Sequence, residues 1–233
     1  MNLIFRDLLE YQDWRIDLNM TKLKEELSKE HFRVAIFGSA RIGRDDPNYK
    51  LVFNLARLIA SEAMDVVTGG GPGMMDAASN GYFKGKKNES QHSIGLNIRL
   101  PHEQTEARHL DIKKDFYNFS SRLDHFMVLS DAVVVAPGGV GTLLEFFYTW
   151  QLVQVEHICN IPIILLGEMW FDLLRWIRKW PMARGLLDQH DVELLYVTRN
   201  CDEAFTIIQE AYRSFREGGK DFCHNYHMYK LKE

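Results

Sequence analysis

The residues best suited to chemistry lie in the segment Pro137-Gly-Gly-Val-Gly-Thr-Leu-Leu-Glu145, which follows the apolar run Val133–Ala136. This order predicts a buried strand, a tight loop and then a helix that begins near residue 140. The N–H groups of such a loop and the N-terminus of the helix face one point, an arrangement that binds phosphate. A bound phosphate would repel the carboxylate of Glu145, one turn into the helix. Its presence therefore indicates chemistry beside a phosphate, and not phosphate binding alone.

Three glycine-rich loops each follow a predicted strand, at residues 38–43, 69–73 and 138–141. In a parallel sheet the carboxyl ends of the strands meet at one edge, and ligands bind there. The convergence of three loops is stronger evidence for a phosphate site than any one of them. The predicted phosphate-binding residues are Gly38, Ser39, Gly69, Gly70, Gly71, Gly138, Gly139, Val140, Gly141 and Thr142.

Other common sites are not expected from the sequence. Neither G-x-G-x-x-G nor G-x-x-x-x-G-K-[ST] occurs, which argues against a nicotinamide dehydrogenase and a P-loop NTPase. The nine histidines form no H-x-x-x-H or H-E-x-x-H pattern, so we expect no metal site. A lysine that forms a Schiff base must lie in an apolar pocket, where burial lowers its pKa. No lysine occupies such a position at the end of an apolar strand. The lysines considered are Lys84, Lys86, Lys87, Lys113 and Lys114.

The composition predicts a soluble, cytoplasmic protein. The 233 residues, 46% of them apolar, can bury one sizeable core but hardly two full domains. A net charge of −4 gives no general attraction to a nucleic acid polymer or an anionic membrane. No run of 18 apolar residues exists, and charged residues within 1–15 argue against a signal peptide. The three widely spaced cysteines fit a reducing compartment, without a disulfide framework or a zinc site.

Apolar segments alternate with segments of helical periodicity, and this alternation sets the predicted fold. Strands are expected at 33–37, 66–68, 93–98, 132–136, 161–166 and 194–197. Helices are expected at 48–63, 74–84, 119–130, 140–157, 169–180 and 202–216, the fifth with Trp170, Trp176 and Trp180 facing the core.

Strands without polar alternation, separated by helices, indicate a parallel sheet that is covered on both faces. The sequence thus predicts a Rossmann-like, doubly wound α/β domain of three layers (α/β/α) over residues 31–216. A helical extension is expected at 1–30, and a loosely ordered polar tail at 217–233.

Four segments together resemble the LOG family of nucleoside 5′-monophosphate phosphoribohydrolases, which were long mislabelled as lysine decarboxylases. They are Phe37-Gly-Ser-Ala-Arg-Ile42, Val66-Val-Thr-Gly-Gly-Gly-Pro-Gly-Met-Met75, Ser93-Ile-Gly-Leu-Asn-Ile98 and Pro137-Gly-Gly-Val-Gly-Thr-Leu-Leu-Glu145. The resemblance runs from about residue 33 to 210. The extended N-terminus and the pattern Gly-Leu-Asn-Ile…Leu-Pro…Glu-Gln within residues 95–104 make the chain look more like the larger bacterial members than the compact plant-type ones.

The resemblance implies a hydrolase that converts AMP or N6-modified AMP into free base and ribose 5-phosphate. It also implies a homodimer with active sites near the interface, and no metal or organic cofactor. The family's motif glutamate falls on Glu145, and its catalytic arginine on Arg122. Such a pair suits the reaction, because a carboxylate stabilises the oxocarbenium character of the ribose and an arginine can bind ribose hydroxyls or phosphate.

The chain departs from the family pattern at Leu123 and Leu144, which replace a cation and an anion and suggest a lost ion pair beside the pocket. Arg108 and His109 are candidate substrate-loop residues. The main alternative is a non-catalytic nucleotide sensor on the same fold. A third reading, with less support, is a partner-binding scaffold that acts through residues 1–30.

Overall fold

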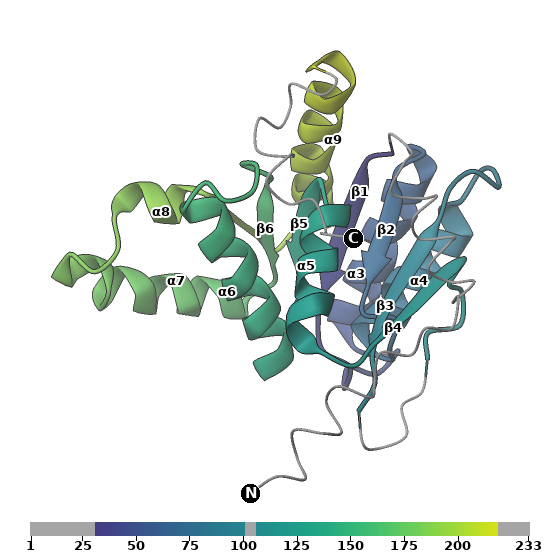
Figure 1. The fold of residues 1–233 in the computed structure, drawn as a ribbon, viewed down its shortest axis with the longest axis horizontal. Coiled ribbons are helices and arrows are strands. Elements are labelled where there is room, and N and C mark those ends of the chain that lie inside the picture. The colour runs from purple at the N-terminus through teal and green to yellow at the C-terminus, as the bar shows by residue number, and fades with distance from the viewer. Residues whose placement is uncertain (1–30, 101–105, 219–233) are drawn as a thin grey trace, which may run out of the picture.

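A computed structural model describes residues 31–100 and 106–218 of the chain (Figure 1). The predicted helical extension at 1–30 and nearly all of the predicted tail, 219–233, lie outside the described residues. Seven strands form within these ranges. They are β1 (Arg33–Phe37), β2 (Asp65–Thr68), β3 (Ser93–Ile98), β4 (Ile112–Phe116), β5 (Ala132–Val135), β6 (Ile163–Leu166) and β7 (Leu195–Thr198).

The strands form one sheet in the order β4-β3-β2-β1-β5-β6-β7, and every pairing is parallel. Strand β1 lies at the centre, where Val34 is in register with Val66 of β2 and with Ala132 of β5. The direction in which the strands are added reverses between β1 and β5. In doubly wound folds the ligand crevice opens at this point, beyond the carboxyl ends of the strands.

Helices cover both faces of the sheet. They are α3 (Pro47–Ser61), α4 (Met74–Gly85), α5 (Phe119–Leu129), α6 (Val140–Gln154), α7 (Met169–Lys179), α8 (Gln189–Glu193) and α9 (Cys201–Gly218), with a 3₁₀ turn at Met182–Arg184. Successive strand residues face opposite sides. Ala35 and Phe37 pack in the core beneath α5, α6 and α7, whereas Val34 and Ile36 pack beneath α3, α4 and α9. The Rossmann-like, three-layer architecture is confirmed.

Two short or polar elements were not predicted from the sequence. Strand β4 contains Lys113, Lys114 and Asp115, and its charges hide the apolar signal of a strand. It lies at the edge of the sheet, where charged residues are common because they discourage pairing with another chain. Helix α8 spans only five residues, which is too short for a periodic pattern.

The prediction that three tryptophans of the helix expected at 169–180 face the core is wrong for two of them. Trp170 is fully buried, but Trp176 is 54% and Trp180 40% exposed. The buried positions of α7 are Trp170, Leu174 and Ile177, which follow helical spacing and define a single inward stripe. The other two tryptophans fall outside that stripe.

The cysteines also differ from expectation. Cys159 is disulfide-bonded, which departs from the expectation of a reducing compartment without a disulfide framework. Sequence spacing cannot show which distant cysteines a fold brings together. Cys201 is free, and burial raises the pKa of its thiol to about 11, which makes it a poor nucleophile at neutral pH.

None of the helices within residues 31–100 and 106–218 combines the length and the apolar content needed to cross a lipid bilayer.

Candidate functional site

Backbone hydrogen bonds join the three glycine-rich loops at the carboxyl ends of the central strands. The N–H of Ser39, after β1, donates to the carbonyl of Pro137, after β5, at 3.1 Å. The carbonyl of Ser39 accepts from the N–H of Met74, at the start of α4, at 2.9 Å. One residue of the first loop is thereby bonded to residues that directly flank the other two. The loops converge at the point where the strand order reverses.

A buried ion pair lies beside these loops. Arg122 of α5 donates from Nη1 to Oε1 of Glu145 of α6 at 2.9 Å, and the two side chains are only 8% and 12% exposed. The arginine is also held by Nε, which donates to the carbonyl of Leu96 in β3 at 2.6 Å, and it lies over the ring of Phe126. The two residues that the sequence singled out as catalytic are therefore in direct contact.

The carboxyl group of Glu145 is shifted toward neutrality. Burial raises the pKa of Glu145, because a charged carboxylate loses its hydration there, and the guanidinium of Arg122 offsets only part of this effect. A carboxyl group with a raised pKa can exchange a proton closer to physiological pH. Such groups occur often at catalytic sites, although buried structural pairs show the same behaviour.

The glycines of the second loop provide space for two polar side chains. A Cβ on Gly69 would lie 2.4 Å from Nη2 of Arg122, and a Cβ on Gly70 would lie 1.8 Å from Oδ1 of Asn97. Gly70 also has a positive φ of 69°, which favours glycine. Its N–H already donates to Oγ1 of Thr68, so what Gly70 contributes is room for Asn97.

Asn97 is a site residue that the sequence analysis did not select. It lies near the carboxyl end of β3, is 9% exposed, and its buried Oδ1 makes no hydrogen bond. An unpaired buried amide oxygen costs about 1–3 kcal/mol, so a ligand that bonded it would recover that cost. A signal was available, because Asn97 is a polar residue within an otherwise apolar strand end.

The third loop leaves the N-terminus of α6 open. Gly139 is the N-cap residue and provides no side-chain cap, Val140 is 84% exposed, and nothing lies within 4 Å of a Cβ built on Gly139 or Gly141. The first N–H groups of a helix have no partners within it, and they carry the positive end of the helix dipole. This end of α6 can therefore accept an anion at a distance of one turn from Glu145.

Other predicted phosphate ligands also make close packing contacts. A Cβ on Gly38 would lie 2.6 Å from Cβ of Met74, so this glycine lets α4 approach β1. A Cβ on Gly138 would lie 2.1 Å from Oγ1 of Thr142, and Thr142 is itself only 4% exposed. The N–H of Gly71 faces Sδ of Met75 at 3.4 Å.

The candidate substrate loop borders the site at one residue and then turns away. The N–H of Ala107 donates to the carbonyl of Gly70 at 2.8 Å. The ring of His109 stacks on Phe83 of α4 with centroids 4.2 Å apart, and its backbone bonds to Ser79. His109 therefore packs against α4.

The two departures from the family pattern occupy different environments. Leu123 is 5% exposed and belongs to the core, whereas Leu144 is 46% exposed on the surface of α6. This difference gives no support to the idea of one lost ion pair between them.

None of the described lysines is buried, and two of those considered above are ion-paired, Lys86 with Asp111 and Lys113 with Glu106. The environment that a Schiff-base lysine requires is therefore not found among the described lysines.

Comparison with known proteins agrees with the geometry. The sequence profile of a family described as "Possible lysine decarboxylase" matches residues 75–208. No curated protein matches the chain.

Among solved structures, the molybdenum cofactor binding protein of Rippkaea orientalis is 22% identical, with a TM-score of 0.58 over 78% of this chain and 98% of its own. The molybdenum cofactor carrier protein of Chlamydomonas reinhardtii is 20% identical, with a TM-score of 0.55 over 78% of this chain and 99% of its own. At this level of identity the likeness establishes the fold.

Proposed function

Because this chain belongs to the LOG family, whose profile covers more than half of its length, we propose that it hydrolyses the N-glycosidic bond of nucleoside 5′-monophosphates. Water adds to C1′ of the ribose, the base leaves with a proton, and the products are free base and ribose 5-phosphate. AMP or N6-modified AMP is the proposed substrate. The observation that carries the proposal is the buried Arg122–Glu145 pair, one turn from an open helix N-terminus.

The N-terminus of α6 is the proposed phosphate site. The N–H groups of the exposed segment 139–141 face solvent without a side-chain cap, so they are available to phosphate oxygens. A phosphate bound there leaves the ribose next to the second turn of the helix, where Glu145 lies.

Glu145 acts on the ribose in this proposal. Cleavage develops positive charge at C1′, and a carboxylate within the pocket stabilises that charge. The same group can accept the proton of the attacking water, which its raised pKa favours. Arg122 keeps Glu145 ionised often enough to do so, and its guanidinium offsets the repulsion between carboxylate and phosphate.

Asn97 is the proposed third polar contact. Its amide is buried next to Gly70, and Arg122 is anchored to the carbonyl of the preceding residue, Leu96. A ribose hydroxyl or a base edge can supply the hydrogen bond that its Oδ1 lacks.

A homodimer is proposed through the face that α5 and α6 present. Large apolar side chains are exposed along this face, at the end of β4 and on both helices, and single proteins rarely leave such patches uncovered. They are Tyr117, Phe119, Val140, Leu144 and Phe147.

The alternative is a non-catalytic nucleotide-binding protein. One observation favours it: two of the structural neighbours are named as a binding protein and a carrier protein for molybdenum cofactor. The same phosphate site would serve either function.

An assay for base release separates the two functions. Pure protein is incubated with AMP, GMP, CMP and N6-prenylated AMP, and free base is measured by chromatography. The hydrolase proposal expects release from at least one purine nucleotide. Glu145→Gln should lower kcat at least 100-fold while nucleotide binding stays equal or becomes tighter, because one negative charge near the phosphate is removed. Micromolar binding without release from any nucleotide would overturn the hydrolase and leave the binding protein.

A further inference from the structure

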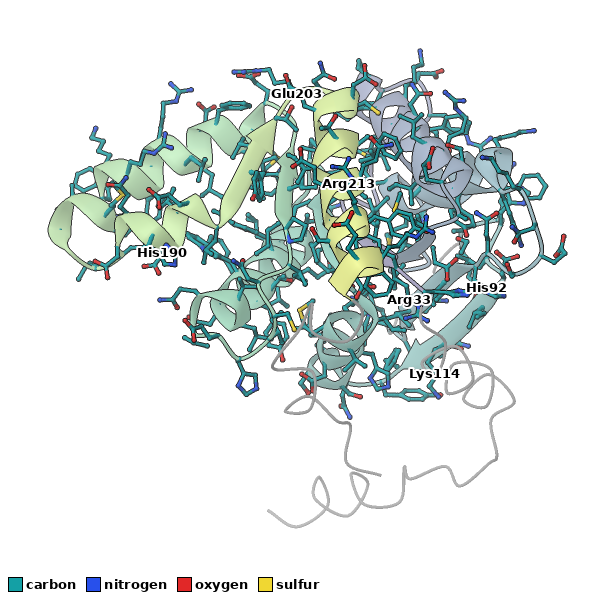
Figure 2. All side chains as sticks on the ribbon, turned by 90° about the horizontal axis from the view of Figure 1, so that it is seen from above. Arg33, His92, Lys114, His190, Glu203 and Arg213 are labelled. Atoms are coloured by element: carbon teal, nitrogen blue, oxygen red, sulfur yellow. The ribbon has the colours of Figure 1, made fainter. Side chains whose placement is uncertain are left out.

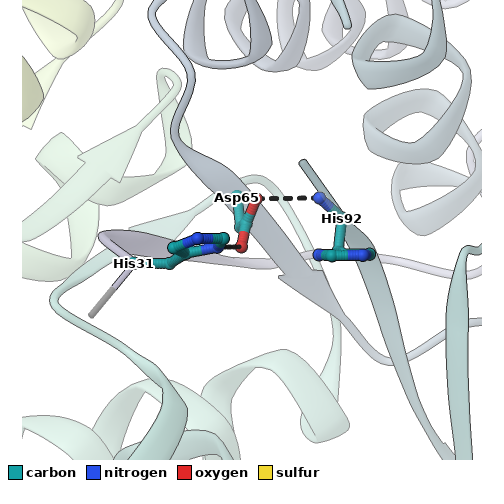
Figure 3. A group of neighbouring side chains, drawn as sticks. All are labelled: His31, Asp65 and His92. Carbon is teal, nitrogen blue, oxygen red and sulfur yellow. Dashed lines mark hydrogen bonds and ion pairs between the residues drawn. The ribbon is translucent and has the colours of Figure 1, made fainter. Parts of the chain in front are cut away.

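A second group of side chains lies at the opposite edge of the sheet, where the strands begin. His31 precedes β1, Asp65 is the first residue of β2, and His92 precedes β3. Figure 3 shows the carboxylate of Asp65 between the two histidines. A ring nitrogen of each histidine and a carboxylate oxygen of Asp65 all lie within 4.8 Å of one another.

The carboxylate of Asp65 is held in place by its neighbours. Oδ1 accepts from the backbone N–H of His92 at 2.8 Å and from the hydroxyl of Tyr82 at 3.2 Å. Oδ2 is 3.0 Å from Nδ1 of His31. The side chain of Asp65 is 1% exposed, but that of His31 is 30% exposed, so the group can be reached from solvent on the side of His31.

The arrangement of the rings suits a shared ligand. The two imidazole planes differ by only 19° and their centroids are 6.4 Å apart. An imidazole bound to zinc at about 2.0–2.1 Å holds its own centre roughly 3 Å from the metal. Two rings on either side of one metal therefore have centroids about 5–6 Å apart, so a small approach of the rings is sufficient.

We propose that His31, Asp65 and His92 form a binding site for Zn²⁺ or a divalent metal of similar preference. Two imidazole nitrogens and one carboxylate oxygen are ligands that zinc prefers, whereas Mg²⁺ and Ca²⁺ prefer sets of oxygen atoms. The metal takes the place of the hydrogen bond between Nδ1 of His31 and Oδ2 of Asp65. Coordination through Oδ2 does not involve Oδ1, whose bonds to Tyr82 and His92 can stay in place.

The site is separate from the Arg122–Glu145 pair, and the proposal does not depend on the proposed function. Its ligands are 34 and 27 residues apart along the chain, so no spacing motif can show them. A bound metal would join the segment that precedes β1 to two neighbouring strands. It would therefore stabilise the folded chain in proportion to its concentration.

The full chain, stripped of metal with a chelator, is titrated with Zn²⁺ by calorimetry and with Co²⁺ by visible absorption. We expect one saturable site per chain with a Kd in the micromolar range or below, and a Co²⁺ band for a site of low coordination number. Zinc at about 100 times Kd should raise the melting temperature by about 5–10 °C. Heat-melting curves are recorded by tryptophan fluorescence.

His31→Ala and His92→Ala should each weaken binding at least tenfold and remove most of the melting shift. His31 is partly exposed, so its replacement should leave the fold intact. The matched control is His190→Ala, because His190 is also near an acidic side chain, Glu193, but is exposed and lies on the far side of the molecule from His92 (Figure 2).

A second control removes His224 and His227, which lie outside the described residues. The site is supported if both controls bind as the wild type does. It is overturned if the wild type does not bind, if all variants bind equally, or if binding disappears only in the second control.

Discussion

Replacing Arg122 by methionine should strongly destabilise the fold, because it leaves a buried carboxylate without its counter-charge. The two side chains of the pair are 8% and 12% exposed and 2.9 Å apart. Breaking a pair buried to this degree costs about 3–5 kcal/mol. The matched control is Arg99→Met, since Arg99 pairs with Asp115 at 2.6 Å but is 56% exposed, and exposed pairs contribute about 0–1 kcal/mol.

The cost should depend on pH in a defined direction. Burial already raises the pKa of Glu145, and loss of the guanidinium raises it further. A carboxyl group whose pKa is higher in the folded state contributes stability below its unfolded pKa, and this is lost as the pH rises through the folded value. The destabilisation of the Arg122 variant should therefore be smallest near pH 4 and largest near pH 8.

Urea unfolding, followed by tryptophan fluorescence at pH 5 and pH 8, measures the effect. Adding Glu145→Gln to Arg122→Met should restore at least half of the loss at pH 8, because no buried charge then remains. The reasoning is refuted if Arg122→Met costs no more than Arg99→Met, or if its cost is the same at both pH values.

Three further outcomes are expected. Gly70→Ala should lower kcat/KM at least tenfold and cost about 1–2 kcal/mol of stability, because its φ is positive and its Cβ would displace Asn97. Gly218→Ala, which adds a methyl group in open space at the end of α9, is the control, and equal effects would contradict this account. The pH profile of kcat/KM should fall on the acid side with an apparent pKa above 4.5, the ordinary value for Glu145; activity that stays flat down to pH 4.5 would exclude its carboxylate as the active form. Burial raises the pKa of Asp131 from 3.8 to about 6. The free energy of unfolding should therefore fall as the pH rises from about 4 to about 6, because the buried side chain must ionise. Asp131→Asn should therefore raise the free energy of unfolding, measured with urea, by up to about 3 kcal/mol at pH 8. At pH 4 the free energy should be nearly unchanged.

Much of the fold could be predicted because its signals are local. The apolar runs of β1 and β5 and the glycines that follow them are properties of short segments. Strand β4 could not be predicted in this way, since its position at the sheet edge permits Lys113, Lys114 and Asp115 within a strand. The exposure of Trp176 was equally hidden, because hydrophobicity alone does not show which stripe of α7 faces inward.

The candidate site likewise contains residues that the sequence could identify and one that only the fold shows. Family resemblance and spacing identified Arg122 and Glu145, and the structure brings them into contact. Asn97 was recognised only in the structure, because the sequence cannot show that its buried Oδ1 has no hydrogen-bond partner. The packing around the second loop could not be predicted for a similar reason. Glycine spacing predicts a tight turn, but it cannot show that the space left by Gly69 and Gly70 is filled by other side chains.

The Arg122–Glu145 pair also connects two parts of the chain that are made at different times. Strands β1 to β4 form one half of the sheet and β5 to β7 the other, and β1–β5 pairing joins them. Helix α5 runs between the halves and anchors Arg122 to Leu96 in the first, whereas Glu145 belongs to the second. During synthesis Arg122 leaves the ribosome before Glu145, because it lies 23 residues earlier in the chain. The pair can form only once α6 has been made, and in the folded protein it links α5, which is anchored to β3, to the helix that follows β5.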